Sequence, residues 1–468
     1  MKICWRCVMN RYPFEDEILT TLCPSPDEAA RVEAVAEKVL TIIDASGVAR
    51  GMVVGSIARN TWTSGDHDLD IFMLFDPSVS REALEEEGRA LGTAIARQFG
   101  GPVVEKYAEH PYTNTIIEGF DIDLVPCYAV ESAARIQSAV DRTPFHTHYI
   151  ISRIIGHEDE VRLFKQLLKV SGLYGSDTMT EGFAGYLCEL LILFFGGFHQ
   201  VIAAAADWKP GVFIDCEKHA TKSFDDPLIV IDPVDPRRNV AASLSLDRFA
   251  EFVELCRGYA AFPSRAFFEP QESLQISEEE FDSVLTARGT TVLALRFATP
   301  KAIPDIIVPQ LRRTEEGITT MLARYEFSVH RSVSFMGDEV CMILVELLTG
   351  TLPALRRHAG PPVWNKENAE KFVAKYRNAD IFGGPAIEDG RYFTEIERQY
   401  QSAAELLRSD EVLQARLGKH VARQLKKSWD VLEGPDVWDE RFSSELAAFF
   451  SYRSPYLRLP LSPSSDPS

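Results

Sequence analysis

Cysteine is scarce in this chain, with 8 among 468 residues. So few cysteines exclude a scaffold held together by disulfides. Only Cys4 and Cys7, in "CWRC", have the spacing of a metal site, and no second CxxC pair follows to complete four zinc ligands. We therefore expect these N-terminal residues to be a poorly ordered extension. Four other cysteines lie in apolar runs and are interpreted as small core residues: Cys127, Cys188, Cys256 and Cys341.

Positive charge is scarce too, because Lys and Arg number 49 against 69 Asp and Glu, for a net charge of -20. This balance excludes a broadly basic coat for nucleic acids but leaves room for a local basic track. No secretory signal pattern is visible. The most apolar stretch, 183–208, contains Glu189 and His199, and charged groups are costly in a bilayer. We predict a buried core helix there, and a cytoplasmic protein without membrane contact.

The length of the chain indicates several domains. Residues 1–14 are the expected extension, and residues 431–468 a C-terminal segment with a disordered end. Capped helices at 25–47 and 80–100, strands at 52–56 and 69–75, and two more strands within 103–128 predict a small α/β head over 15–148. Helices at 158–175, 183–208 and 245–263, interrupted by a turn-rich segment at 226–245, predict a helical region over 149–270.

The third region, 271–430, has a different pattern. Strand, helix, strand, strand, helix and strand follow one another at 290–297, 309–325, 327–335, 339–348, 365–376 and 390–400. That order is typical of a ferredoxin-like or RNA-recognition-type sheet. Helical sequence follows to about residue 429. The fold class is therefore α+β with several domains.

The stretch "GSIARNTWTSGDHDLDIF", from Gly55 to Phe72, combines features of a phosphate site. Gly55 permits close approach of a phosphate where the strand ends, and the hydroxyl of Ser56 can hold phosphate oxygens. Arg59 follows about one helical turn later, and its guanidinium can clamp a triphosphate.

Carboxylates follow at a spacing that places them together. Asp68 and Asp70 are two residues apart on an apolar strand, so both project from one face. Asp121 and Asp123 repeat this spacing on a later strand. Such a cluster is unfavourable unless cations compensate it, and Mg²⁺ suits oxygen ligands. Two metal ions there would activate an attacking hydroxyl and stabilise a departing pyrophosphate.

This stretch resembles the nucleotidyltransferase signature of the DNA polymerase β superfamily. Further segments at 138–150, 162–177, 180–198 and 224–245, including "DRTPFHT" and "DPVDPRRNVAAS", are similar to archaeal-type (class I) CCA-adding tRNA nucleotidyltransferases. The similarity covers roughly residues 15 to 430. It implies a polymerase-β-like head, a helical neck, a ferredoxin-like or RRM-like body and a helical tail. It also implies template-independent addition of CCA to the 3′ end of tRNA, at the acceptor stem, using CTP, ATP and Mg²⁺.

The resemblance also implies roles for individual residues. It assigns catalytic metal binding to Asp68, Asp70 and Asp123, and phosphate contacts to Ser56 and Arg59 beside Gly55. Further nucleotide-binding positions fall on His146, Lys165 and Tyr174, and a base-reading position falls on Arg238. Taken alone, Lys165 could equally be a solvated charge, His146 a structural histidine and Tyr174 a core residue.

Two other patterns concern RNA. Glu158 to Arg162 fits the EDxxR pattern of bacterial and eukaryotic CCA-adding enzymes, but the companion motifs of that class are missing, so we interpret Glu158 and Arg162 as an i,i+4 helix pair. A basic helix face, which is either solvated or a track for tRNA phosphates, is predicted near the end of the chain, with Arg391 and Tyr392 as an added contact. Its residues are Arg416, Lys419, His420, Arg423, Lys426 and Lys427.

Three alternatives remain at this point. Another template-independent nucleotidyltransferase, such as a poly(A) polymerase, shares the catalytic head. An antibiotic-modifying nucleotidyltransferase has no evident need for the long C-terminal region. A tRNA-binding protein without catalysis has no need for all three carboxylates. The sequence leaves open whether the chain forms a homodimer.

Overall fold

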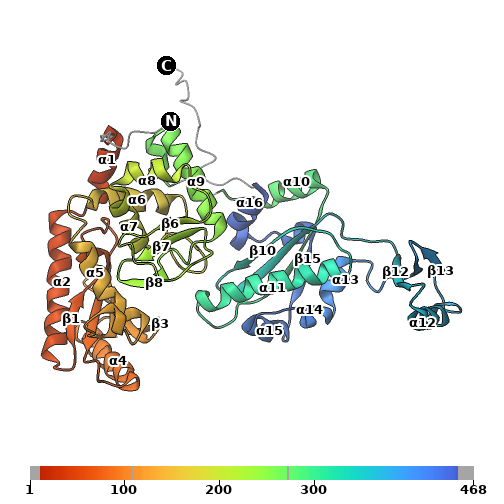
Figure 1. Cartoon of the computed structure of the whole chain (residues 1–468), viewed down its shortest axis with the longest axis horizontal. Helices are drawn as coiled ribbons and strands as arrows, with labels where there is room; N and C mark the ends of the chain where they lie inside the picture. Colours follow the sequence, from red (N-terminus) through yellow and green to blue (C-terminus); the bar gives the residue numbers. More distant parts are fainter. Residues whose placement is uncertain (1–10, 108, 271–273, 452–468) are drawn as a thin grey trace, which may run out of the picture. The chain divides into compact units, whose positions relative to one another are not determined.

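A computed structural model describes residues 11–107, 109–270 and 274–451 (Figure 1). These residues divide into two compact units, the first ending at residue 270 and the second beginning at 274. The predicted N-terminal metal-like pair, Cys4 and Cys7, and the end of the C-terminal segment lie outside the described residues.

The first unit contains a five-stranded sheet that carries the candidate site. Its strand order is β1-β2-β5-β4-β3, with β2 parallel to β5 and the other pairs antiparallel. Helices α2 (Pro26–Ala45) and α4 (Arg81–Gln98) begin at the predicted caps, where Ser25 and Ser80 accept backbone N–H groups. The strands are β1 (Arg50–Val53), β2 (Asp68–Phe75), β3 (Val104–Tyr107), β4 (Pro111–Ile117) and β5 (Phe120–Tyr128).

The prediction of two strands within 103–128 is wrong, because the structure has three. The missed turn lies at Glu118 and Gly119, which both have positive φ, 54° and 90°. Glutamate rarely adopts this conformation, so the pair gave no turn signal in the sequence. The extra strand, β4, matters because it supplies Asn114 to the carboxylates of β5.

Helices build the rest of the first unit around one apolar core. The predicted helix over 245–263 is confirmed, the one over 158–175 ends earlier, at Val170, and the single helix over 183–208 is wrong. The chain breaks at Gly196 and Gly197, with φ of 88° and 148°, into two helices bent by 91°. Among the described residues no single helix is long and apolar enough to cross a membrane. The helices are α1 (Pro13–Leu22), α5 (Thr143–Ile151), α6 (Glu158–Val170), α7 (Gly185–Phe195), α8 (Phe198–Ala205) and α9 (Leu246–Ala261).

The segment 226–245, predicted to be turn-rich chain, instead contains a hairpin. Strands β7 (Leu228–Asp232) and β8 (Asp235–Asn239) pair with each other, and β6 (Val212–Ile214) pairs with β7. Every residue of β7 is buried, so its sequence lacks the alternation that marks a half-exposed strand. Asp232 and Asp235 flank the tight turn between the strands.

The second unit contains a four-stranded antiparallel sheet with the order β10-β11-β9-β15. Numbered by their sequence, these strands follow the order second, third, first, fourth, which is the ferredoxin-like order that the sequence predicted. Residues alternate along β9 and β11 between two cores, so both faces of the sheet are covered. The strands are β9 (Thr291–Ala298), β10 (Val329–Met336), β11 (Val340–Leu347) and β15 (Asp430–Glu433).

The identity of the fourth strand was predicted wrongly. The segments 365–376 and 390–400 form α12 (Lys366–Tyr376) and β14 (Arg391–Glu397). Strand β14 belongs to a separate sheet ordered β12-β14-β13. Strands β12 (Leu355–Pro362) and β13 (Gly383–Glu388) complete that sheet. The remaining helices pack on the two cores of the larger sheet: α10 (Glu278–Arg288), α11 (Pro304–Arg324), α13 (Ala403–Arg408), α14 (Glu411–Gln414), α15 (Lys419–Leu425) and α16 (Ser443–Ser451).

Candidate active site

The carboxylates predicted from their spacing lie on two adjacent parallel strands. In the register of β2 and β5, Asp70 is paired with Asp123 and Asp68 with Asp121. The intervening Leu69 is buried in the sheet core. Alternation along both strands therefore directs the four acidic side chains to the same face.

These carboxylates repel one another. Burial, followed by the negative charge of Asp123, raises the pKa of Asp70 to about 6. Burial and Asp121 raise the pKa of Asp68 as well. Asp123 accepts hydrogen bonds from Asn114 at 2.7 Å and from Lys106 at 3.4 Å, and Asn114 also donates to Asp121. The group has more negative charge than its neighbours neutralise.

The donor set fits a hard divalent cation, because such cations prefer carboxylate oxygens and relieve their repulsion. Within the described residues, however, no three His, Cys, Asp or Glu side chains form a group arranged to hold a metal ion. Binding of a cation pair by these acidic side chains therefore stays a prediction.

The turn before α3 (Gly55–Ala58) brings backbone against these carboxylates. Gly55 has φ of 73°, and a Cβ at this position would collide with Oδ2 of Asp70. The backbone N–H of Val54 donates to the carbonyl of Asp70 at 3.0 Å. Only glycine fits such an approach without displacing the carboxylate.

A buried group of charges lies beside this turn. Arg59 donates to the carbonyl of Gly55 at 2.7 Å and to Glu189 on α7 at 2.5 Å. Glu189 also accepts the hydroxyl of Thr61 at 2.5 Å. Lys165, on α6, is buried and donates to the carbonyl of Thr61 at 3.0 Å. Desolvation lowers the pKa of Lys165, although Glu189 opposes the effect.

These groups surround one cleft of about 400 Å³. It contains most of the predicted site residues: Gly55, Ser56, Arg59, Asp68, Asp70, Asp123, Lys165 and Tyr174. Sequence reasoning missed Lys106, Tyr186 and Glu189, which also line it. The signal that could have identified Glu189 was its charge within an apolar helix. That charge was used only as an argument against a membrane-spanning helix.

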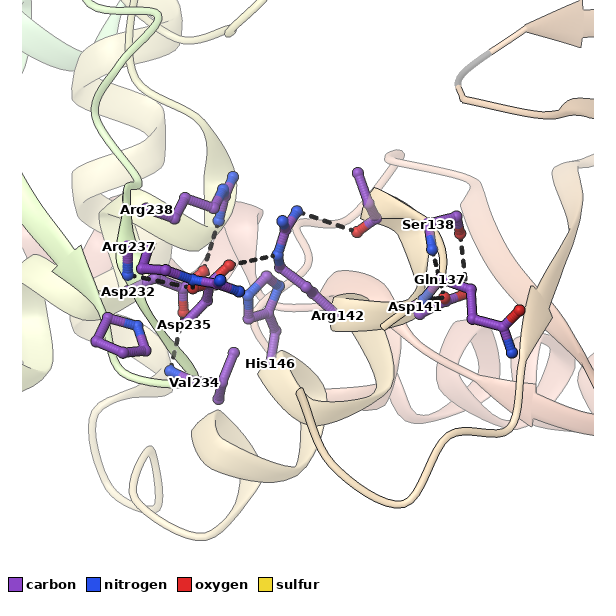
Figure 2. Close-up of polar contacts among 12 residues, drawn as sticks. Gln137, Ser138, Asp141, Arg142, His146, Asp232, Val234, Asp235, Arg237 and Arg238 are labelled. Atoms are coloured by element: carbon purple, nitrogen blue, oxygen red, sulfur yellow. Dashed lines mark hydrogen bonds and ion pairs between the residues drawn. The ribbon is translucent and has the colours of Figure 1, made fainter. Parts of the chain in front are cut away.

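His146 and Arg238, the other two predicted nucleotide-binding residues, do not line this cleft. Both contact Asp232, at 2.8 Å and 2.7 Å (Figure 2). The ring of His146 stacks on that of Tyr186, with centroids 4.1 Å apart. Because Tyr186 is a wall of the cleft, His146 lies directly behind that wall.

The prediction that Glu158 and Arg162 pair along their helix is wrong. Arg162 is buried and donates to Asp159 at 2.9 Å, to the carbonyl of Trp62 at 2.9 Å and to that of Asn60 at 2.8 Å. Glu158 accepts the backbone N–H of Gly156 instead. Arg162 therefore fastens α6 to the loop after α3.

The predicted basic face in the second unit is shorter than expected. Helix α15 covers only Lys419–Leu425, and Lys426 follows as its C-cap. Three of the predicted residues have partners within the protein: Arg416 pairs with Glu316, His420 with Gln310 and Lys427 with Gln424. Exposed positive groups remain at Lys419, Arg423 and Lys426. In the smaller sheet Arg391 is exposed, and the ring of Tyr392 lies 6.1 Å from that of Phe372.

Three protein families match successive parts of the chain. They are a nucleotidyltransferase domain at 34–146, the second domain of tRNA nucleotidyltransferase at 159–269, and the C-terminal domain of CCA-adding enzymes at 288–434. A CCA-adding enzyme of Methanoregula boonei is 55% identical over 96% of this chain and 98% of its own length. One of Methanosarcina barkeri is 42% identical over 90% of this chain and 93% of its own. A solved structure of a poly(U) polymerase is 13% identical over 55% of this chain and 98% of its own, with a TM-score of 0.44.

Proposed function

The chain belongs to the archaeal family of CCA-adding enzymes, and on this premise we propose that the cleft beside β2 and β5 is its nucleotidyl-transfer centre. The enzyme adds CCA to tRNA without a nucleic-acid template. One observation carries the assignment of the cleft: Asp70 faces Asp123 in register, with the backbone of Gly55 packed against it. The buried cations Arg59 and Lys165 line the same space.

Asp68, Asp70 and Asp123 would hold two divalent cations, with Mg²⁺ as the proposed metal. When bound, these ions activate the 3′ hydroxyl of tRNA for attack and stabilise the departing pyrophosphate. The raised pKa values of Asp68 and Asp70 support this assignment, since burial and then the neighbouring carboxylates disfavour their charged forms, which a bound cation would stabilise.

The phosphates of CTP or ATP would bind at the buried cations that line the same cleft, Arg59 and Lys165. Within the described residues Lys165 donates only to neutral oxygens of Thr61, and Glu189 is the one carboxylate paired with Arg59, so two cations here face a single bound anion. A triphosphate would supply the missing negative charge. The hydroxyl of Ser56 would add a neutral hydrogen bond, and Tyr174 would form part of the wall.

Base selection is assigned to Arg238, with His146 behind the wall formed by Tyr186. A guanidinium only donates hydrogen bonds. Cytosine and adenine each present an unprotonated ring nitrogen on their pairing edge, whereas uracil and guanine present an N–H there. A fixed arginine therefore favours the first pair of bases over the second.

The tRNA backbone is proposed to contact Lys419, Arg423 and Lys426, with Arg391 and Tyr392 as a second contact. These cations are exposed and have no acidic partner in the part of the chain that the structure describes, which supports this role because phosphate contacts dominate binding to nucleic acids. We place the enzyme in the cytoplasm, together with tRNA, CTP and ATP.

The test uses tRNA that lacks its last three nucleotides, with labelled CTP and ATP. We expect extension to stop after three additions, whereas a poly(A) polymerase would continue. Asp70→Ala should abolish incorporation while tRNA binding is retained. The matched control is Asp76→Ala, which removes an exposed carboxylate just after the same strand. Unchanged incorporation by Asp70→Ala would refute the metal assignment.

A further inference from the structure

Asp232 is a buried carboxylate on which several side chains converge (Figure 2). It lies at the end of β7 and accepts hydrogen bonds from Arg238 at 2.7 Å and from the backbone of Val234 at 3.1 Å. His146 lies 2.8 Å from the same carboxylate, and the hydroxyl of Tyr186 donates to it at 3.3 Å. One carboxylate thus joins side chains from α5, α7 and β8.

The charge on Asp232 is strongly stabilised. Burial alone would raise the pKa of this carboxyl, but hydrogen bonds and charge from His146 and Arg238 outweigh that effect and hold it at about 2. Asp232 is therefore ionised throughout the physiological range. A buried anion of this kind fixes Arg238 and its neutral hydrogen-bond partners, since each would lose a hydrogen bond to a charged group by moving away.

The partners of Asp232 connect it to the nucleotide cleft. Tyr186 lines the cleft and stacks on His146. Arg238 remains 37% exposed, and within the described residues Asp232 is its guanidinium's only hydrogen-bond partner. The other N–H groups of Arg238 are therefore available to a ligand.

We propose that Asp232 is a positioning residue for base selection, which holds Arg238 and the Tyr186–His146 wall in the orientation that admits cytosine and adenine. This inference rests on the proposed role of Arg238. Asp232 touches no substrate; it acts by removing the rotational freedom of the arginine. Without it, the guanidinium could turn and pair with the acceptor oxygens of uracil or guanine, so discrimination would fall while chemistry continued.

The neighbouring Asp235 supplies a matched control. It is buried in the same turn, and it accepts Arg142 at 3.0 Å and the backbone of Arg237 at 3.1 Å (Figure 2). Neither of these partners lines the cleft, whereas Asp232 accepts a hydrogen bond from Tyr186, which does. Asp235→Asn should therefore disturb the fold to a similar degree as Asp232→Asn without reaching the base.

The experiment measures kcat/KM for CTP and UTP on tRNA lacking CCA, and for ATP and GTP on tRNA ending in CC. We expect Asp232→Asn to lower both the CTP/UTP and the ATP/GTP ratio by at least about tenfold, the value of one hydrogen bond to a charged group. Asp235→Asn should leave both ratios unchanged. Each ratio is independent of the fraction of folded enzyme, so a stability loss alone cannot produce the effect.

Arg238→Ala separates the inference from the proposed function. If Arg238→Ala loses discrimination and Asp232→Asn keeps it, the inference is overturned and base reading by Arg238 stands. If Arg238→Ala also keeps full discrimination, both the inference on Asp232 and base reading by Arg238 are refuted. The proposal that the enzyme adds CCA to tRNA would still stand. Should Asp232→Asn fail to fold, Asp232→Glu keeps the charge but shifts the carboxylate by one methylene. Full discrimination in that variant would equally overturn the proposal.

Discussion

Gly55 is a residue at which the backbone packs closely against a candidate catalytic carboxylate, that of Asp70. It has a left-handed conformation, and a methyl group at this position would collide with the carboxylate of Asp70. Two separate constraints therefore act on one position, the backbone angle and the space beside a carboxylate. They can be distinguished because Gly47 has nearly the same φ, 72° against 73°, but no atom lies within 4 Å of where its methyl group would be.

We predict that Gly55→Ala lowers the rate of nucleotide addition by at least about 100-fold, because a displacement of Asp70 by an ångström is enough to misplace it. Gly47→Ala should leave the rate unchanged. Both variants should lose about 1 kcal/mol of stability through backbone strain. Single-turnover incorporation of CMP and thermal unfolding measure the two effects. Equal rates for the two variants would contradict the role given to the Gly55 turn.

Residue types and spacing sufficed to place three carboxylates on one face of two strands, because alternation in a strand is a local property. The same reasoning could not find Glu189 or Asp232. Each has a partner far away in sequence, Arg59 at 130 residues from Glu189 and His146 at 86 residues from Asp232. Only the folded chain brings such residues together, and neither belongs to a pattern that sequence inspection can recognise.

At the scale of elements, helices with caps were predicted closely, whereas buried strands and bends were not. Ser25 and Ser80 mark helix starts by chemistry that operates within one turn. The break between α7 and α8 depends on two adjacent glycines inside an apolar run, and β15 is only four residues long. Tertiary pairing decides which short strand completes a sheet. The sequence pattern therefore predicted β14 as the fourth strand, whereas the structure has β15 there.

The larger sheet of the second unit is held by a buried ion group centred on Glu346 of β11. Its carboxylate accepts Arg288 and Arg331, each at 2.7 Å, and the hydroxyl of Thr290 at 2.6 Å. Burial would raise the pKa of Glu346, but hydrogen bonds from these three residues outweigh it and lower the pKa to about 2. The carboxylate therefore contributes stability above the pKa of the unfolded chain, and this is lost as the pH falls from about 4.5 towards 2.

We predict that Glu346→Gln destabilises the second unit by about 3 kcal/mol at pH 7, because it leaves the buried Arg331 and the partly buried Arg288 without their counter-ion. The difference from the unmodified protein should shrink as the pH falls from 4.5 towards 2. Urea unfolding at several pH values measures it. The control, Glu339→Gln, removes a highly exposed partner of Arg441 and should cost little. A difference that stays constant with pH would contradict this account.

Helix α15 provides the second prediction at this scale. We expect the combined substitution Lys419→Ala, Arg423→Ala and Lys426→Ala to weaken tRNA binding and to make it less dependent on salt. The slope of log Kd against log salt concentration should fall by about one unit for each cation that no longer meets a phosphate. Filter binding at several salt concentrations measures the slope. Lys38→Ala, in an exposed pair with Glu118 in the first unit, is the control. An unchanged slope would exclude α15 from the RNA interface.

At the scale of the whole molecule, acidity and RNA binding must coexist in one chain of net charge -20. The two units make this possible because each has its own cores. The buried core residues of the first lie between 18 and 268, and those of the second lie between 276 and 447. The cleft proposed for nucleotide transfer lies in the first unit, and the exposed cations proposed for tRNA lie in the second.

We therefore predict that residues 1–271 and 272–468, expressed separately, each unfold in one cooperative transition. The first fragment should bind CTP in the presence of Mg²⁺ with an affinity within a few-fold of that of the full chain, because every residue of the cleft is retained. Its KM for tRNA should rise roughly 100-fold or more, since the phosphate contacts of the second unit are absent. Calorimetric titration with CTP and extension assays across tRNA concentrations measure these values. If the first fragment extended tRNA with the KM of the full chain, the RNA track would have to lie on the first unit instead, and the exposed cations of α15 would be no more than a solvated surface.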